Sequence, residues 1–295
     1  MLHTASQTSI GAPAPALPPM GPGLVLRVLS KRPRPAGAGA PGPLTSSFTL
    51  PAIDAGHVAR YCAALGFVPG AVPLTWWYLP VQRAHMATML TDAFPYRLAG
   101  IVHVENELEA HAAPPLDKPI RLDTRIEILP PTSSGAVYCA LETTGSAAGE
   151  RIFTCTSKYL AVRGQRSGKA KGSARAGTQA GSVIDSWNLA SSSGRAYARV
   201  SGDWNPIHLT RWSARLMGLP APIIHGMHTV AKAGAALERA SGRRVTAILA
   251  RFRSPLALGT AVEMHRHAGA AADGEESYAV AGDGMLAVEG SARLG

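Results

Sequence analysis

The residues best suited to chemistry stand at positions 201–208, which read Ser-Gly-Asp-Trp-Asn-Pro-Ile-His. Asp203 and His208 are five residues apart. Pro206 between them blocks a helix and biases Asn205 away from helical geometry. Both side chains can therefore point into one cleft from a tight loop. A carboxylate and an imidazole placed in this way can accept and deliver protons, and the Asn205 amide can brace the loop or a bound water.

A second motif, Pro-Ile-Ile-His-Gly-Met at 222–227, leads into an Ala-rich stretch that predicts a helix over 227–240. A helix N-terminus presents free N–H groups and the positive end of a dipole. Gly226 lets a ligand approach the backbone closely, which suits a carbonyl oxygen that becomes enolate-like. Taken alone, the Asp-x-x-Asn-Pro segment is also typical of a capped turn without chemistry. The presence of the second motif favours a catalytic site over a capped turn without chemistry.

The elements that must position these motifs follow one plan twice. In each half helices come first, the longest helix next, and then about four strands with partial alternation of apolar and polar residues. In the first half the pattern predicts helices over 57–65 and 81–92 and strands over 101–109, 120–129, 136–144 and 151–162. In the second half it predicts helices over 195–200, 211–217 and 227–240 and strands over 244–252, 261–267, 275–280 and 286–292. Such a sheet needs a helix to cover its apolar face, so we expect an α+β fold present in two copies.

Composition suggests the boundaries. Residues 1–45 are rich in Pro, Gly and Ala and should form a disordered or poorly ordered N-terminal segment, with one short ordered element at 24–29. A first domain is expected over 46–163 and a second over 182–295. Between them, residues 164–181 have the composition of a basic flexible linker.

The formal charge of +10 raises the question of nucleic-acid binding. Nine of the 29 basic residues lie before Asp54 or within 163–175, and without them 20 basic residues face 19 acidic ones. The globular part is therefore nearly neutral, and no recognition helix or RNA-binding aromatic pattern accompanies the charge. We expect no nucleic-acid partner.

Three cysteines, Cys62, Cys139 and Cys155, form no CxxC pair. Their odd number and spacing predict neither a disulfide framework nor a zinc site and favour a reducing, cytoplasmic location. No apolar run reaches the roughly 18 residues that a membrane span needs, so no membrane insertion is expected. No signal peptide is predicted either.

The two motifs together resemble the hydratase-2 motif of the MaoC-like family of (R)-specific enoyl-CoA hydratases and 3-hydroxyacyl-thioester dehydratases. The resemblance rests on Ser-Gly-Asp-Trp-Asn-Pro-Ile-His at 201–208 and on Gly226 in His-Gly-Met, 18 residues after His208. Arg-Phe-Arg-Ser-Pro-Leu-Ala-Leu-Gly at 251–259 resembles that family's next strand and turn. The strong likeness covers about residues 195–260. More loosely, 74–100 and 157–163 resemble the N-terminal half of relatives with a double hotdog, in which two antiparallel sheets each wrap around a central helix.

This resemblance implies a hydro-lyase: reversible addition of water to a trans-2-enoyl thioester, giving a (3R)-3-hydroxyacyl thioester in fatty-acid or related acyl metabolism. It implies no metal and no organic cofactor. His208 would act as base toward water, Asp203 would deliver the C2 proton, and the Gly226 N–H would bind the thioester oxygen, with Asn205 as an orienter. The first half contains no Asp-x-x-Asn-Pro-x-His, so one site per chain is expected.

Further residues are predicted to bind the acyl-CoA or acyl-carrier-protein substrate: Trp204, His225, Met227, Arg251 and Arg253. The two arginines would meet CoA phosphates if they reach the mouth of the cleft. Trp204 is a departure, since a smaller or charged residue is frequent there in the family. His85 and His103 of the first half either line an acyl tunnel or are ordinary interior histidines. A monomeric double hotdog and a homodimer are both compatible with the sequence.

Three other functions remain open. Hotdog folds also hydrolyse acyl-CoA, and a thioesterase would use a carboxylate to activate water at the carbonyl carbon. A non-catalytic acyl-thioester binding subunit is possible because fold does not imply function. Nucleic-acid binding through the basic linker would require salt-sensitive affinity that is lost on deleting 164–176.

Overall fold

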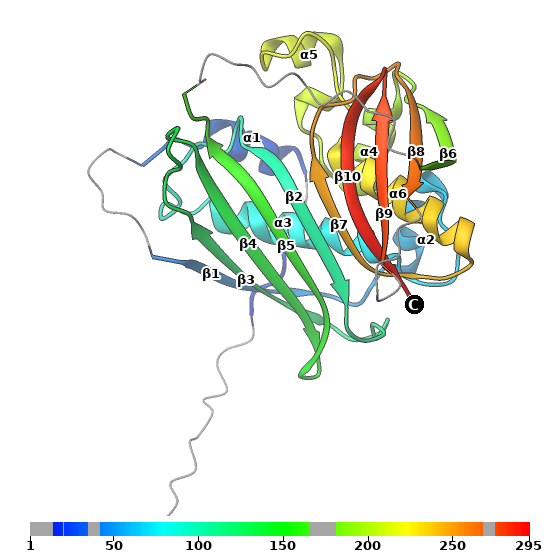
Figure 1. Cartoon of the computed structure of the whole chain (residues 1–295). Coiled ribbons are helices and arrows are strands. Elements are labelled where there is room, and N and C mark those ends of the chain that lie inside the picture. Colours follow the sequence, from blue (N-terminus) through cyan, green and yellow to red (C-terminus); the bar gives the residue numbers. More distant parts are fainter. Residues whose placement is uncertain (1–13, 20, 35–41, 166–180, 268–274) are drawn as a thin grey trace, which may run out of the picture.

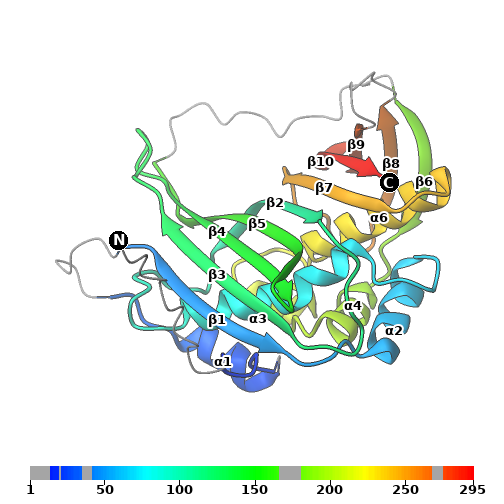
Figure 2. The same cartoon turned by 90° about the horizontal axis from the view of Figure 1, so that it is seen from below.

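A computed structural model describes residues 14–19, 21–34, 42–165, 181–267 and 275–295. Ten strands form one sheet in the order β1-β3-β4-β5-β2-β7-β10-β9-β8-β6, and all paired neighbours in it are antiparallel. The helices lie in the concave side of this sheet, which curls around them (Figure 1, Figure 2).

The two halves of the sheet have the same strand order. From the outer edge inward, the first half runs β1-β3-β4-β5-β2 and the second runs β6-β8-β9-β10-β7. The halves meet where β2 pairs with β7, with Asn106 opposite Ala250. All five strands of one half have a counterpart at the same place in the other half, which indicates two copies of one fold. The α+β double hotdog predicted from the sequence is therefore confirmed, with its two sheets joined into one.

The elements of the first half are α1 (Pro22–Ser30), β1 (Leu44–Leu50), α2 (Ala55–Leu65), the 3-10 helix η1 (Leu74–Trp77), α3 (Tyr78–Met89), β2 (Val102–Ala110), β3 (Ile120–Ile128), β4 (Val137–Ala147) and β5 (Glu150–Val162). Those of the second half are β6 (Ser182–Asn188), α4 (Ser193–Ser201), the 3-10 helix η2 (Pro206–His208), α5 (Arg211–Leu216), α6 (Gly226–Ser241), β7 (Val245–Phe252), β8 (Ala261–His267), β9 (Glu275–Gly282) and β10 (Met285–Leu294).

Each half places one long helix, α3 or α6, against its sheet. Helix α3 tolerates Pro80 because proline fits the first turn, where the N–H has no intrahelical partner. Helix α6 is rich in alanine and is buried from Met227 to Glu238 with few exceptions. One hydrophobic core runs through both halves. The halves therefore form a single packed body, in which α3 can reach a site of the second half.

Most predicted elements are present, with ends shifted by a few residues. The prediction of about four strands per half was low by one, because β1, which precedes α2, and β6, which precedes α4, were not recognised. Both lie at the edges of the sheet, and their side chains are mostly half-buried or exposed. An edge strand of this kind lacks the clean alternation by which the inner strands are recognised.

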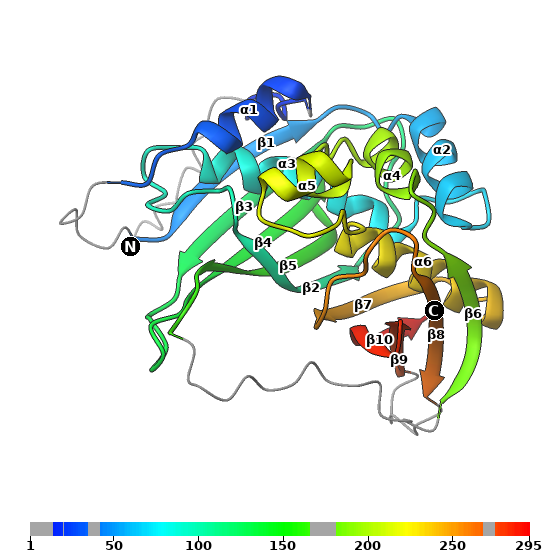
Figure 3. The same cartoon turned by 90° about the horizontal axis from the view of Figure 1, so that it is seen from above.

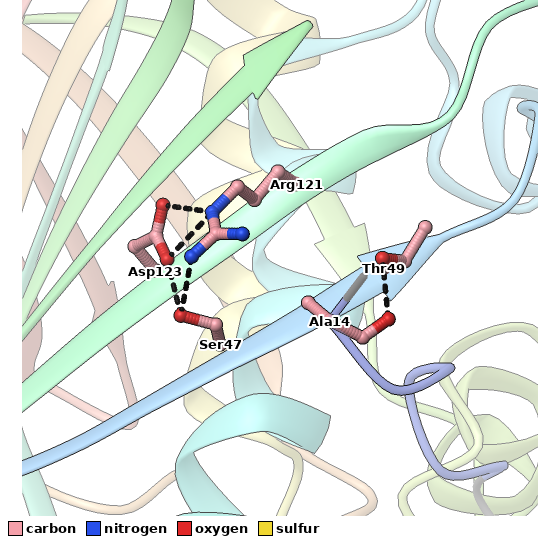
Figure 4. Close-up of polar contacts among 5 residues, drawn as sticks. All are labelled: Ala14, Ser47, Thr49, Arg121 and Asp123. Carbon is pink, nitrogen blue, oxygen red and sulfur yellow. Dashed lines mark hydrogen bonds and ion pairs between the residues drawn. The ribbon is translucent and has the colours of Figure 1, made fainter. Parts of the chain in front are cut away.

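Part of the N-terminal segment lies against the sheet. Within residues 1–45, Pro22–Ser30 form α1, where the sequence predicts one short ordered element at 24–29, and Ala16 forms a parallel bridge with Thr49 of β1. The Thr49 hydroxyl also donates to the carbonyl of Ala14 (Figure 4). This contact covers the outer edge of β1, which would otherwise expose unpaired backbone groups. Nearby, Arg121 and Asp123 of β3 pair at 2.9 Å and both contact Ser47 (Figure 4).

The remainder of that segment and most of the predicted linker, residues 166–180, lie outside the described residues. The division into an N-terminal and a C-terminal domain at 164–181 stays a prediction. Among the residues that the structure describes, no helix is long and apolar enough to cross a membrane.

Candidate active site

The loop that carries Asp203 begins where α4 ends. Gly202 caps α4 in the left-handed conformation, at φ 76°, which glycine adopts without strain. The Asn205 side chain then accepts a hydrogen bond from the N–H of Ile207 at 3.3 Å and caps η2, whose first residue is Pro206. The chain therefore turns sharply between Asp203 and His208 instead of continuing as a helix.

Helix α4 holds this loop at both of its ends. Near its start, a side chain at Gly194 would collide with the carbonyl oxygen of His208, and Arg195 donates to the carbonyl of Leu209 at 2.9 Å. Near its end, His57 of α2 donates from Nε2 to the carbonyl of Val200 at 2.7 Å. Packing around α4 thus fixes the two ends of the segment from 203 to 208.

Both oxygens of the Asp203 carboxylate accept hydrogen bonds. The N–H of Asn205 donates to Oδ1 at 3.1 Å, and Nε2 of Gln82 donates to Oδ2 at 2.8 Å. Gln82 lies on α3, in the first half of the chain, and is 8% exposed. The first half therefore contributes a side chain directly to the candidate site, as well as its packing surface.

His208 is held so that one ring nitrogen remains available. It is 7% exposed, and its Nδ1 lies 2.8 Å from the carbonyl oxygen of Ile223. Because a carbonyl can only accept, Nδ1 carries the proton and Nε2 of the neutral ring can accept one. The ring stacks on His225 with 3.7 Å between centroids. His225 in turn donates from Nε2 to the backbone carbonyl of Asp203 at 2.9 Å.

Asp203, His208 and His225 form the one group of three potential metal ligands found among the described residues. One ligand atom from each lies within 4.8 Å of the others. His225 Nδ1 is buried without a partner, and both histidines donate their other ring nitrogen to a backbone carbonyl. These residue types could hold a transition metal. The family resemblance implies that no metal binds here, and that expectation remains a prediction.

Burial and neighbouring groups shift the pKa values of this cluster. Burial would raise the pKa of Asp203, but the nearby His225 and His208, the Gln82 amide and the Asn205 N–H together outweigh it and lower that pKa. Burial lowers the pKa of His208, against the opposing effect of Asp203. Burial and the adjacent His208 lower the pKa of His225 to about 3. At neutral pH the cluster therefore consists of a carboxylate and two neutral imidazoles.

Gly226 is the first residue of α6, so its N–H has no intrahelical acceptor. A side-chain carbon at this position would lie 2.6 Å from the ring of Phe252 on β7. Glycine therefore allows the start of α6 and the Phe252 ring to approach closely. A free N–H at this point can bind an oxygen that gains negative charge.

The structure separates the predicted substrate-binding residues into groups. His225 belongs to the cluster around Asp203, and Trp204 is half-buried in the same loop. Met227 packs in the main hydrophobic core. Arg251 pairs with Glu105 and Arg253 with Glu289, so the sheet supplies partners for both guanidinium groups. A role for these residues in binding substrate remains a prediction.

Gln82 was not among the site residues predicted from the sequence. It lies between Val81 and Arg83, 121 positions before Asp203, and belongs to no motif. One signal was present: an amide that is buried in the expected helix needs a hydrogen-bond partner.

A comparison with known protein families matches residues 178–286 to the MaoC like domain. The chain carries a MaoC-like domain. The family resemblance read from the two motifs is thereby confirmed, and the matched range contains Asp203, Asn205, His208 and Gly226.

Two curated relatives come from Mycobacterium tuberculosis. The chain is 28% identical to 3-hydroxyacyl-thioester dehydratase X over 188 residues, which cover 63% of this chain and 67% of that protein. It is 36% identical to 3-hydroxyacyl-thioester dehydratase Y over 104 residues, which cover 30% of this chain and 36% of that one. A crystal structure of HtdX from the same organism is similar with a TM-score of 0.68 and 26% identity, covering 85% of this chain and 99% of the other.

Proposed function

We propose that this protein is a hydro-lyase that interconverts trans-2-enoyl thioesters and (3R)-3-hydroxyacyl thioesters. The observation that carries the proposal is the pairing of Asp203 and His208 beside the start of α6. A carboxylate oxygen of Asp203 lies within 4.8 Å of a ring nitrogen of His208. The MaoC-like domain and the relatives named 3-hydroxyacyl-thioester dehydratases support the same reaction. The site lies in the second half, with Gln82 as the contribution of the first.

In the hydration direction, the water molecule that is added lies between Asp203 and His208. His208 Nε2 takes a proton from it while the oxygen bonds to C3 of the enoyl thioester. The lowered pKa values of both groups leave the Asp203 carboxylate and His208 Nε2 without a proton in the resting site. The proton that reaches C2 is therefore the one that the water released, passed on through the pair. Asp203 delivers this proton to C2, and the pair ends each turnover unprotonated.

Charge that builds on the thioester oxygen is stabilised by the N–H of Gly226 at the positive end of α6. Asn205 holds Asp203 through its backbone N–H and caps η2 through its side chain, which makes it a positioning residue. His225 supports the same loop through the Asp203 carbonyl and through its stacking on His208.

The test is a hydration assay with crotonyl-CoA and a longer 2-enoyl-CoA, with the chirality of the product determined. We expect (3R)-3-hydroxyacyl-CoA, formed at a rate unchanged by a chelator, and loss of most of the rate in Asp203→Asn, which keeps the shape of the carboxylate. Release of free CoA would instead indicate a thioesterase. Tight binding of the substrate without turnover would indicate a binding subunit, and an Asp203→Asn rate equal to wild type would refute the assignment.

A further inference from the structure

Helix α5 (Arg211–Leu216) presents an apolar and basic surface directly after the catalytic loop. Trp212 is 73% exposed and Leu216 is 68% exposed, the two highest values among the large hydrophobic side chains described. Arg211 and Arg215 are exposed on the same helix. Residues four apart lie on the same face of a helix, so this tryptophan and leucine form an exposed apolar patch. Patches of this kind mark interaction sites.

Helix α5 is held firmly in place, although these side chains are exposed. Thr210 and Ser213 form a reciprocal capping box at the start of α5. The Ser213 hydroxyl also donates to the carbonyl of Pro206 at 2.7 Å, and Ala214 is fully buried. Helix α5 is thus fixed to η2, whose last residue is His208. A partner that docks on α5 lies next to the catalytic loop.

The charged residues of α5 are all basic. Neither arginine of α5 takes part in an ion pair among the described residues, and the helix has no acidic residue. Helix α1, visible with α5 in the view from above (Figure 3), repeats the combination: Leu26 is 67% exposed beside Arg27. A cavity of about 400 Å³ at the end of α1 is lined by Arg27, Lys31, Arg32 and Arg34, with Asp92 as the one acidic lining residue.

We propose that the α5 surface, defined by Arg211, Trp212, Arg215 and Leu216, docks an acidic protein that carries the acyl thioester, so that the substrate is bound to a carrier protein. This rests on the proposed function. Tryptophan and arginine are the residues that most often dominate protein–protein binding, and two unpaired arginines complement an acidic surface. A nucleotide would need a concave site that encloses most of it, whereas all four side chains project outward.

The experiment compares one acyl group on three carriers: crotonyl on an acidic acyl carrier protein, crotonyl-CoA, and the crotonyl thioester of N-acetylcysteamine, which has no phosphate. The variants are Trp212→Ala and Arg215→Glu. Two controls lie at exposed positions outside α5: Leu116→Ala also removes an exposed large apolar side chain, and Arg125→Glu makes the same charge reversal as Arg215→Glu. For the α5 variants we expect KM for the carrier-bound substrate to rise at least about tenfold, as at an interface hot spot. We expect KM for the other two substrates and all kcat values to stay as in wild type.

Several outcomes would overturn the docking proposal. An equal rise in KM for crotonyl-CoA would mean that α5 binds the nucleotide. An unchanged KM for the carrier-bound substrate, or an equal rise in the control variants, would mean that α5 is not a docking surface. A lower molecular mass of Trp212→Ala in solution would mean that α5 contacts a second copy of this chain. If no substrate is turned over, the proposed function fails. Calorimetric binding of the carrier protein then still tests the surface, and binding that Trp212→Ala leaves intact would overturn it.

Discussion

The two halves of the molecule differ most in the loop that follows α2 in the first half and α4 in the second. Helices α2 and α4 pack against each other, and both end at a glycine in the left-handed conformation, Gly66 at φ 84° and Gly202 at φ 76°. After Gly66 the chain reads Phe-Val-Pro-Gly-Ala-Val-Pro, without a titratable group, and Phe67 joins the core. After Gly202 it supplies Asp203 and His208.

The central helices of the two halves, α3 and α6, differ in the residue with which they begin. Helix α3 begins with Tyr78, a large buried side chain, whereas α6 begins with Gly226, which leaves its N–H approachable. Both halves bury histidines, but His85 of α3 bonds to the hydroxyl of Thr143, whereas His208 lies beside the Asp203 carboxylate. The comparison teaches that a duplicated fold can concentrate its chemistry in one copy. In the proposed function, the other copy supplies packing and positioning side chains: Gln82 at the Asp203 carboxylate and His57 at the end of α4.

The largest expected effect separates two buried histidines. His208→Gln should lower kcat for hydration by about 10²–10⁴-fold, because a general base contributes about that much. His85→Gln, at an equally buried position of the first half, should leave kcat near wild type, with any change appearing in the melting temperature. Steady-state kinetics and thermal unfolding check both. Equal losses of kcat in the two variants would remove the distinction between the halves.

The second largest expected loss of kcat comes from a substitution at the start of α6. Gly226→Ala should lower kcat by about 10²–10³-fold, the cost of losing one oxyanion donor, because the added methyl meets the Phe252 ring and displaces the N–H. The double variant Gly226→Ala with Phe252→Ala should recover part of that loss. If the second substitution gives no recovery, the contact with Phe252 is not the cause.

A smaller effect tests the contribution of the first half. Gln82→Leu removes a hydrogen bond to the charged Asp203, and such bonds are worth about 1.5–3 kcal/mol, which corresponds to roughly a 10- to 100-fold loss of kcat/KM. Thr88→Val is the matched control, since Thr88 is a buried polar residue of α3 that bonds to Ala84 and Ser46 instead. A normal rate in Gln82→Leu would confine the site to the second half.

The smallest expected effect is the change of hydration activity with pH. Hydration needs neutral His208 and ionised Asp203, and both have pKa values below their ordinary ones. Activity should therefore be lost toward acid, by up to about tenfold per pH unit once His208 becomes protonated, and the apparent pKa of this limb should lie below 6.5. Measurements of kcat/KM from pH 4 to 8 check it. An acid limb centred above 6.5 would contradict a buried, neutral His208.

Local pattern predicted a large part of the fold. The inner strands alternate because one face is buried, and Thr210 and Gly66 mark helix ends by their own chemistry. The edge strands β1 and β6 lack such alternation. The meeting of β2 and β7 depends on how the two halves dock, which neither half encodes locally.

The candidate site divides in the same way. Asp203 and His208 could be paired from the sequence because a proline-fixed turn of five residues brings them together. Gln82 reaches Asp203 only through packing of α3 against the second half, across 121 residues. Arg251 and Arg253 were expected near the ligand, but whether a guanidinium at a strand end meets a ligand or a glutamate on the next strand depends on register and side-chain direction.

The central claim is that Asp203 and His208 act as one unit, and the double variant Asp203→Asn with His208→Gln tests it most directly. Two groups that share one proton transfer lose their function together, so the second substitution should cost little once the first is made. We predict that kcat for crotonyl-CoA hydration in the double variant falls about as far as in the more damaged single variant. Losses that multiply, so that each substitution keeps its full effect in the presence of the other, would contradict the account.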